Sequence, residues 1–330
     1  MRDRLPRSST FIARLTALAI LGSAAPNAGA ATIEWNNAAG GNWSAASNWT
    51  PPSVPGAGDD VLITLAGTYT VTLDVDATIN WLSLGGAGGT QTLAASGRTL
   101  GLNDASVVNP AGVIALTTCT LNGPGGVTNQ GLANLRSCVV NAPLVNQGTL
   151  DLRANNSLNG AFTNAAGGTL HVEAEDTWGN ATATVASGFT NSGTIELKSS
   201  GTASWSAAAT LNVTAGTLVN APGGTIVALA GTGYARTLGA QLDNQGTVTA
   251  AYALTLARAS AAHSNSGTIQ QQRDDRGQRR RPDDQPVGHH AELHQLGHAD
   301  GGRGADAHGE RRDVERERGH AGWRRGAGVE

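Results

Sequence analysis

The chain has few charged residues, few aromatic residues and almost no lysine. Of its 330 residues, 14% are charged and 4% are aromatic, Lys198 is the one lysine, and the formal net charge is −3. A chain so close to neutrality argues against a nucleic-acid partner. Helical apolar periodicity is equally scarce, whereas short alternating runs such as residues 68–73 recur and are typical of β-strands. The composition and the pattern together indicate an all-β protein.

A long apolar run is also missing, except near the N-terminus. Four arginines among the first fourteen residues precede an apolar stretch at 15–22 and the small residues Ala28-Gly29-Ala30. This order is typical of a secretory signal peptide cleaved before Ala31. The alternative is a membrane anchor, but a bilayer span needs roughly 20 apolar residues. We therefore expect residues 1–30 to be a signal peptide and the mature protein to be secreted, with no transmembrane segment.

What the chain has in abundance is a repeated phrase, apolar-x-Asn-x-Gly-Thr-apolar-x-apolar. It recurs at intervals of about 17 to 31 residues. A unit of this length cannot bury a core alone and must stack on copies of itself. The clearest copies are residues 144–152, 189–197 and 242–248, the lengthened ones are 162–172 and 218–228, and another ends at Ile269.

Within each unit, apolar side chains alternate with a period of two, so that pairs such as Leu150 and Leu152 form an inward face. The glycine before the threonine permits a corner with positive φ. The asparagine two residues earlier can bond local backbone and stack on its counterparts in a ladder. These features predict a parallel β-helix solenoid over residues 66–270, right-handed because parallel crossovers prefer that hand. A β-propeller or an antiparallel sandwich is the alternative.

Stacking the units predicts two outward columns of titratable side chains. The first contains Asp151, His171 and Glu196, and the second contains Arg153, Glu173 and Lys198. Opposite charges alternate along the second column, which suits cross-strand pairing worth about 0.2–1 kcal/mol per pair. The first column could be an acid–base or metal cluster, or it could be a solvated polar face.

The two cysteines lie in matching contexts, Cys119-Thr-Leu-Asn and Cys138-Val-Val-Asn. Equal phase predicts that they face each other on neighbouring coils, where strands lie about 4.8 Å apart. That spacing is compatible with a disulfide in an oxidising compartment. Two buried free thiols in one core column are the equal alternative.

Residues 31–65 form a distinct entry segment that contains Trp35, Trp43 and Trp49. These rings could stack on the sugar rings of a glycan. They could also cap the open end of the solenoid, which a stack of repeats requires, and we favour the cap. Asp59-Asp60 is expected to fix a turn at the start of a strand, and calcium binding by this pair is the weaker alternative.

These motifs resemble those of a known group of proteins. Asn48-Trp49, Val54-Pro55-Gly56 and Asp59-Asp60-Val61 look like the start of large secreted bacterial β-helix proteins. The Asn-x-Gly-Thr-Leu repeats resemble adhesin and autotransporter passenger domains. The resemblance covers about residues 31–270. It implies a passenger exposed on the bacterial surface and often adhesive, and it carries over no catalytic residue.

The leading hypothesis is therefore a non-enzymatic structural or adhesive protein of the bacterial surface, without metal or cofactor. Its expected partners are host or matrix glycans, other cell-surface components, or further copies of the chain. One alternative is a polysaccharide-active lyase or hydrolase, which needs carboxylates or a basic residue converging from adjacent coils. The other is a glycan-binding module that uses the three tryptophans.

The composition changes abruptly at Gln271. Residues 271–330 contain no Ser, Thr, Asn or Ile, but they hold six of the eight histidines and twelve arginines. This segment lacks the apolar content of a core and is expected to be disordered. Taken literally, its histidines indicate a metal-binding helix and its runs of arginine indicate a basic arm. The residues concerned are His289, His290, His294 and His298.

A shift of reading frame near residue 270 explains this change better. Regrouping plausible codons over residues 288–301 by one base yields the phrase Phe-Thr-Asn-Ser-Gly-Thr, which is the wording of residues 189–194. In that interpretation the tail is a translation artefact, and neither the metal site nor a basic arm has a function. We expect its removal to leave stability unchanged.

Overall fold

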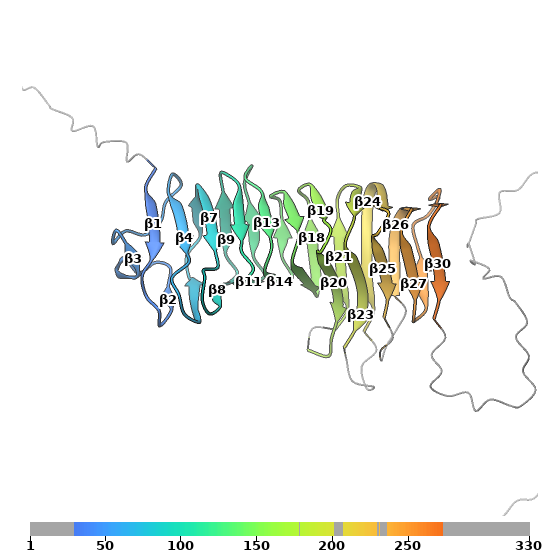
Figure 1. Ribbon diagram of the computed structural model, residues 1–330, viewed down its shortest axis with the longest axis horizontal. Coiled ribbons are helices and arrows are strands. Elements are labelled where there is room, and N and C mark those ends of the chain that lie inside the picture. Colours follow the sequence, from blue (N-terminus) through green and yellow to red (C-terminus); the bar gives the residue numbers. More distant parts are fainter. Residues whose placement is uncertain (1–29, 178, 201–206, 230, 232–235, 273–330) are drawn as a thin grey trace, which may run out of the picture. The chain divides into compact units, whose positions relative to one another are not determined.

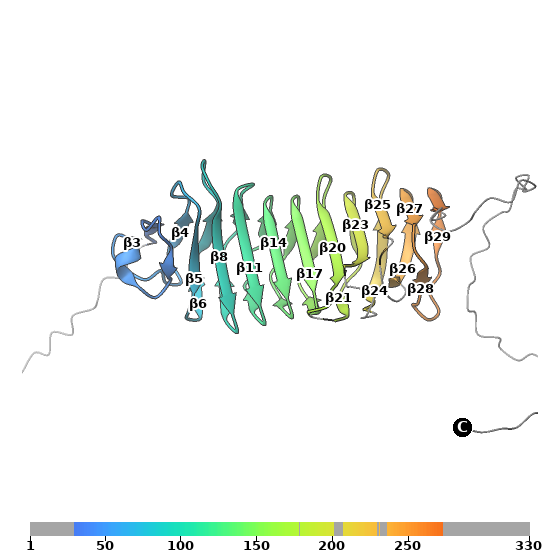
Figure 2. The ribbon, with the colours of Figure 1, turned by 90° about the horizontal axis from the view of Figure 1, so that it is seen from below.

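The computed structural model describes residues 30–177, 179–200, 207–229, 231 and 236–272. The described chain folds as a parallel β-helix, as the repeat predicts, and neither alternative fold is present (Figures 1 and 2). The expected signal peptide, apart from Ala30, and the tail from residue 273 lie outside the described residues. Within the described ranges, no helical segment has the length and hydropathy of a membrane span.

Each complete coil contributes one strand to each of three parallel faces, in the order face 1, face 2, face 3. Face 1 contains β1 (Thr32–Trp35), β4 (Asp60–Ile63), β7 (Trp81–Leu84), β10 (Ser106–Val108), β13 (Val127–Asn129), β16 (Leu144–Asn146), β19 (Phe162–Asn164), β22 (Phe189–Asn191), the C-terminal parts of β24 (Ala209–Asn220) and β26 (Arg236–Asn244), and β29 (Ser264–Asn265).

Face 2 is a separate sheet of β2 (Gly41–Asn42), β5 (Tyr69–Leu73), β8 (Gln91–Ser96), β11 (Gly112–Thr117), β14 (Leu132–Arg136), β17 (Thr149–Arg153), β20 (Thr169–Ala174), β23 (Thr194–Ser199), β25 (Thr225–Ala228), β27 (Thr247–Ala250) and β30 (Thr268–Gln271). Face 3 contains β6 (Ala77–Ile79), β9 (Thr99–Leu102), β12 (Thr120–Asn122), β15 (Val139–Val140), β18 (Asn155–Leu158), β21 (Ala181–Val185), the N-terminal parts of β24 and β26, and β28 (Leu254–Leu256).

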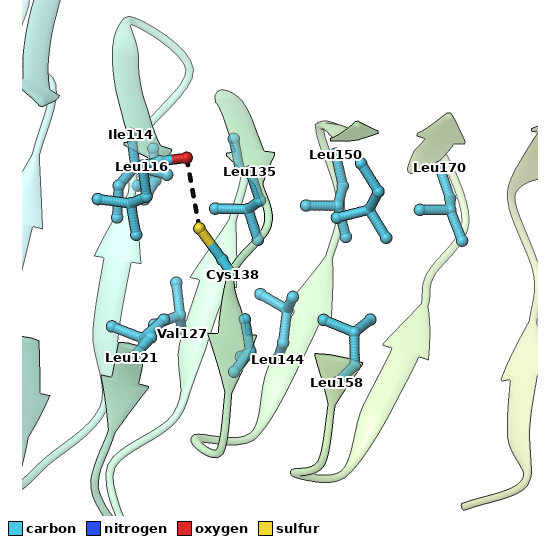
Figure 3. Packing of buried hydrophobic residues seen from close by; sticks show 14 of the residues in the cluster. Ile114, Leu116, Leu121, Val127, Leu135, Cys138, Leu144, Leu150, Leu158 and Leu170 are labelled. Carbon is cyan, nitrogen blue, oxygen red and sulfur yellow. Dashed lines mark hydrogen bonds between the residues drawn. The ribbon is translucent and has the colours of Figure 1, made fainter. Parts of the chain in front are cut away.

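The core runs along the inside of the stack, because alternate residues of each strand point inward. Leu150, Leu170 and Ile195 are paired in register on β17, β20 and β23, and each is fully buried. They form one column of the core, as predicted, and Figure 3 shows the packing around two of them. Burying a side chain of this size contributes about 1.5–3 kcal/mol, so a column that recurs in every coil supplies much of the stability.

The glycine of the repeat has a different role from the one predicted. Gly148 and Gly193 do not have positive φ. Instead, a Cβ added to Gly148 would lie 2.3 Å from the carbonyl oxygen of Gly131, and a Cβ on Gly193 would lie 2.1 Å from that of Gly168. Only glycine fits, because the corners of neighbouring coils touch backbone to backbone. In the lengthened unit, the extra Gly167 takes the left-handed conformation, with φ of 83°.

Candidate functional site

The densest group of titratable side chains lies on the outer surface of face 2. The register pairs Asp151 on β17 with His171 on β20, and His171 with Glu196 on β23. Two residues further along the same strands, Glu173 is paired with Lys198. Because parallel strands in register keep equivalent side chains adjacent, the structure brings together both predicted columns. We call these residues, with Arg153, Glu175 and Arg136, the charged network.

In the first column, the imidazole of His171 lies between two carboxylates. Its Nδ1 is 2.6 Å from an oxygen of Asp151, and its Nε2 is 3.1 Å from an oxygen of Glu196. The side chains are 12%, 18% and 26% exposed for Asp151, His171 and Glu196, respectively. A neutral imidazole donates from one nitrogen, and an imidazolium donates from both. The arrangement can therefore hold or pass one proton between neighbouring coils.

In the second column, Glu173 links two cations. Arg153 donates from Nη2 to Glu173 at 2.5 Å, and Lys198 Nζ lies 3.6 Å from the same oxygen. Arg153 also lies 3.5 Å from Asp151, so the columns are joined. At the edge of the network, Glu175 faces Arg153 at 3.5 Å and Arg136 at 3.7 Å. Opposite charges therefore meet on adjacent coils, as the sequence predicts.

The electrostatics of Asp151 show which effect dominates. Burial alone would raise its pKa, but the hydrogen bond and the charge of His171, together with the charges of Arg153 and Lys198, outweigh burial and lower the pKa below its usual range. The carboxylate is thus held ionised by its neighbours. No group of three or more His, Cys, Asp or Glu side chains within the described ranges has an arrangement that could hold a metal ion.

The three tryptophans of the entry segment are buried. Trp35, Trp43 and Trp49 are 2%, 0% and 1% exposed, and Trp49 packs edge-to-face on each of the other two with ring centroids 4.8 Å apart. Trp35 and Trp49 donate their indole N–H groups to the carbonyls of Asn37 and Trp43. This burial argues against the alternative that the rings bind a glycan, because it leaves no ring face exposed for a sugar to stack on. Their packing is that of a cap.

The predicted turn at Asp59 and Asp60 is present. Asp59 accepts hydrogen bonds from the backbone N–H groups of Gly56 at 2.8 Å and Ala31 at 3.3 Å. Asp60 is the first residue of β4 and accepts from the side chain of Asn80 at 2.6 Å. Asp59 therefore closes the turn that begins at Gly56, and both carboxylates also bond more distant parts of the chain, which supports the turn interpretation of this pair.

Cys119 and Cys138 are buried, and both thiols are free. They occupy equivalent positions on adjacent coils, since the residues after them, Thr120 and Val139, are paired in register. The Cys138 thiol donates to the carbonyls of Leu116 and Arg136 at 3.3 Å each, and Figure 3 shows the first bond. Burial raises the pKa of the Cys138 thiol. Of the two alternatives left open by the sequence, the structure contains the buried thiols rather than the disulfide.

Some polar residues inside the stack were not predicted. Asn156 is 2% exposed and continues the cysteine column into the next coil, where its side chain accepts from the Cys138 N–H at 2.9 Å and donates to the Arg153 carbonyl at 2.8 Å. Thr118 and Ser137, directly before the two cysteines, and Ala154, two residues before Asn156, all have φ between 51° and 55°. The sequence could have indicated Asn156, because it occupies the position equivalent to the two cysteines in the next coil. The left-handed corner could not have been predicted, because no single residue type occupies it.

The fold defines a class, the parallel β-helices in which each coil supplies a strand to three faces, and the charged network lies on one of these faces. No protein-family model, no curated protein and no solved structure matches the chain.

Proposed function

We propose that the chain is a structural and adhesive scaffold of the bacterial surface, without an enzymatic activity. The observation that supports this proposal most directly is the use of polar side chains to bind coil to coil. Seven asparagines form one ladder, six of them fully buried inside the stack, in which the amide N–H of one coil donates to the amide oxygen of the next at 2.7–2.8 Å. Such a ladder stabilises length and regularity, which a scaffold needs.

The charged network fits the same purpose. Its carboxylates and cations face one another across β17, β20 and β23, so their charges are balanced between neighbours. The signal peptide expected over residues 1–30 and the resemblance to adhesin passengers support a location outside the cell.

A polysaccharide-active enzyme is the second candidate. The observation that favours it is the column of Asp151, His171 and Glu196, because two carboxylates and a proton-carrying group reach the outer surface from adjacent coils. On the scaffold proposal these groups stabilise face 2 and turn over no substrate.

One experiment separates the two candidates. Beads coated with the mature chain are tested for adhesion to matrix and polysaccharide surfaces, and the free protein is tested for loss of viscosity of pectin and alginate. The scaffold proposal expects adhesion that persists in folded Asp151→Asn and no loss of viscosity. Depolymerisation by the wild type that disappears in folded Asp151→Asn would refute it. Absence of adhesion on every surface would refute the adhesive part alone.

A further inference from the structure

The asparagine ladder has a direction, and the last coil leaves it incomplete. In every earlier step, the Nδ2 group of an asparagine makes two bonds to the coil that follows. Asn220 donates to Asn244 Oδ1 at 2.7 Å and to the Thr247 carbonyl at 3.2 Å, and Asn244 donates to Asn265 Oδ1 at 2.7 Å and to the Thr268 carbonyl at 3.1 Å. Each amide is therefore satisfied by the next Asn-x-Gly-Thr corner.

Asn265 accepts from Asn244, but none of the described residues accepts a hydrogen bond from its Nδ2 group. Its side chain is exposed, whereas the six asparagines before it are fully buried. The interior of the same coil is open as well, because Leu254, Leu256 and Ile269 are only partly buried. Strands β28, β29 and β30 each pair with one earlier strand, so within residues 236–272 all three faces end in an edge that no later described strand covers.

We propose that this end of the stack is a docking surface for one further coil whose corner reads Asn-x-Gly-Thr. That coil runs parallel to β29 and β30, its asparagine oxygen and threonine carbonyl accept from Asn265 Nδ2, and its glycine lies against Gly267. The glycine is required, because a Cβ on Gly267 itself would lie 2.1 Å from the Gly246 carbonyl oxygen and the same close approach repeats at every corner.

The N-terminal end of a second copy of the chain cannot serve as this further coil. The N-terminal end is closed by Trp35, Trp43 and Trp49, and β1 is paired on both sides, with β3 (Trp49–Thr50) and with β4. The first ladder asparagine, Asn129, lies far inside the stack. The sequence after Gln272 contains no asparagine, so residues 273–330 as they stand cannot provide this corner, whereas the shifted reading frame inferred from the sequence would supply the phrase Phe-Thr-Asn-Ser-Gly-Thr near residue 290.

The test adds one coil to the full chain. Residues 252–272 are duplicated directly after Gln272, which places a second asparagine 21 positions after Asn265, the spacing of Asn244 and Asn265. The thermal midpoint is measured for the natural and extended chains, each with and without Asn265→Ala, and Asn244→Ala in the natural chain serves as the reference. A matched control carries alanine for the asparagine of the added coil.

We expect the extended chain to melt higher than the natural chain by about 2–4 °C or more, and the control to lose most of that gain. Asn265→Ala should shift the midpoint little in the natural chain and as much as the Asn244→Ala reference in the extended chain. Equal shifts of Asn265→Ala in both chains, or no gain from the added coil, would overturn the proposal. A natural chain that is dimeric in solution and becomes monomeric on Ile269→Lys would also overturn it, since the occupant would then be a second copy.

Discussion

At the scale of single residues, the buried asparagine is the most specific feature of this chain. Asn191 accepts from Asn164 at 2.7 Å and donates to Asn220 and to the Thr225 carbonyl at 2.8 and 3.1 Å. This position therefore needs a short planar side chain that carries both a hydrogen-bond acceptor and two N–H donors. Aspartate cannot replace it, because an ionised carboxylate offers no donor. A buried polar group that loses its partner keeps the full cost of its desolvation.

We therefore expect Asn191→Ala to lower the free energy of unfolding by about 1–3 kcal/mol or more, because it leaves polar groups on both neighbouring coils without a partner. Urea unfolding followed by circular dichroism measures it. Asn141→Ala is the matched control, since Asn141 lies in an exposed ladder between Asn122 and Asn159 and should change stability by less than about 0.5 kcal/mol. Equal costs at the two positions would contradict the role given to burial.

A second residue-scale prediction concerns the glycine of the corner. Gly193→Ala places a Cβ against the Gly168 carbonyl, so the two coils must separate locally, and the expected cost is about 1–3 kcal/mol or more. Gly58→Ala is the control, because no atom lies within 4 Å of the added Cβ. The test compares the urea unfolding midpoints of the two variants with that of the wild type. An unchanged midpoint for Gly193→Ala would mean that the corners of neighbouring coils can separate without a measurable loss of stability.

At the scale of elements, the charged network makes the stability of β17, β20 and β23 depend on pH. The pKa of Asp151 is lowered in the folded state, below the value of about 3.9 that an unfolded aspartate has. Its contribution is therefore fully present above about pH 4 and is lost as the pH falls through the lowered pKa. We expect the thermal midpoint of the wild type to fall in this acid range and Asp151→Asn to fall less. Glu34→Gln is the control, because Glu34 is exposed and outside the network, and its thermal midpoint should fall as that of the wild type does. If the midpoint of Asp151→Asn fell as steeply as that of the wild type, Asp151 would not be the cause of the pH dependence.

The entry segment is the other element with a testable role. Trp49 packs on both Trp35 and Trp43 at the end of the core, so Trp49→Ala should remove the cap and cost about 3–5 kcal/mol. Trp81→Ala is the matched control, because Trp81 is only half-buried on β7, and its loss should cost less. Calorimetry of both variants compares them. If Trp49→Ala melted like the wild type, the solenoid would not need this cap.

At the scale of the whole molecule, the sequence predicted those features that repeat and missed those that depend on how the coils meet. Alternation around Leu150 and Leu170 predicted the inward face, and the spacing of the corners predicted the in-register pairing of Asp151 with His171.

The role of Gly193 could not be predicted, because its constraint comes from the Gly168 carbonyl of another coil rather than from its own φ. The need for a cap favoured burial of the tryptophans but did not establish it, since an indole ring suits both a sugar surface and a core. The left-handed corner at Ser137 leaves no mark, because residues other than glycine occupy it.

The same repeat logic yields a prediction for the molecule as a whole. Coils interact mainly with their neighbours, so a chain that loses one whole coil should fold and a chain that loses half a coil should not. Deleting residues 130–146 removes 17 residues, the spacing of Asn129 and Asn146. Asn129 then precedes Asn164 by the natural spacing of 18 residues, and Leu150 comes to stack on Ile114, which occupies the same inward column.

We expect the 130–146 deletion to unfold in one cooperative step with a smaller urea m-value, because the slope scales with the surface exposed on unfolding. Deleting residues 130–138 is the matched control. It removes about half a coil, so β15 would follow directly on face 1, the asparagine register would be lost, and inward and outward positions would no longer agree between neighbours. This shorter deletion should give no cooperative transition. Cooperative folding of the half-coil variant, or unfolding of the whole-coil variant, would show that contacts beyond adjacent coils determine the fold.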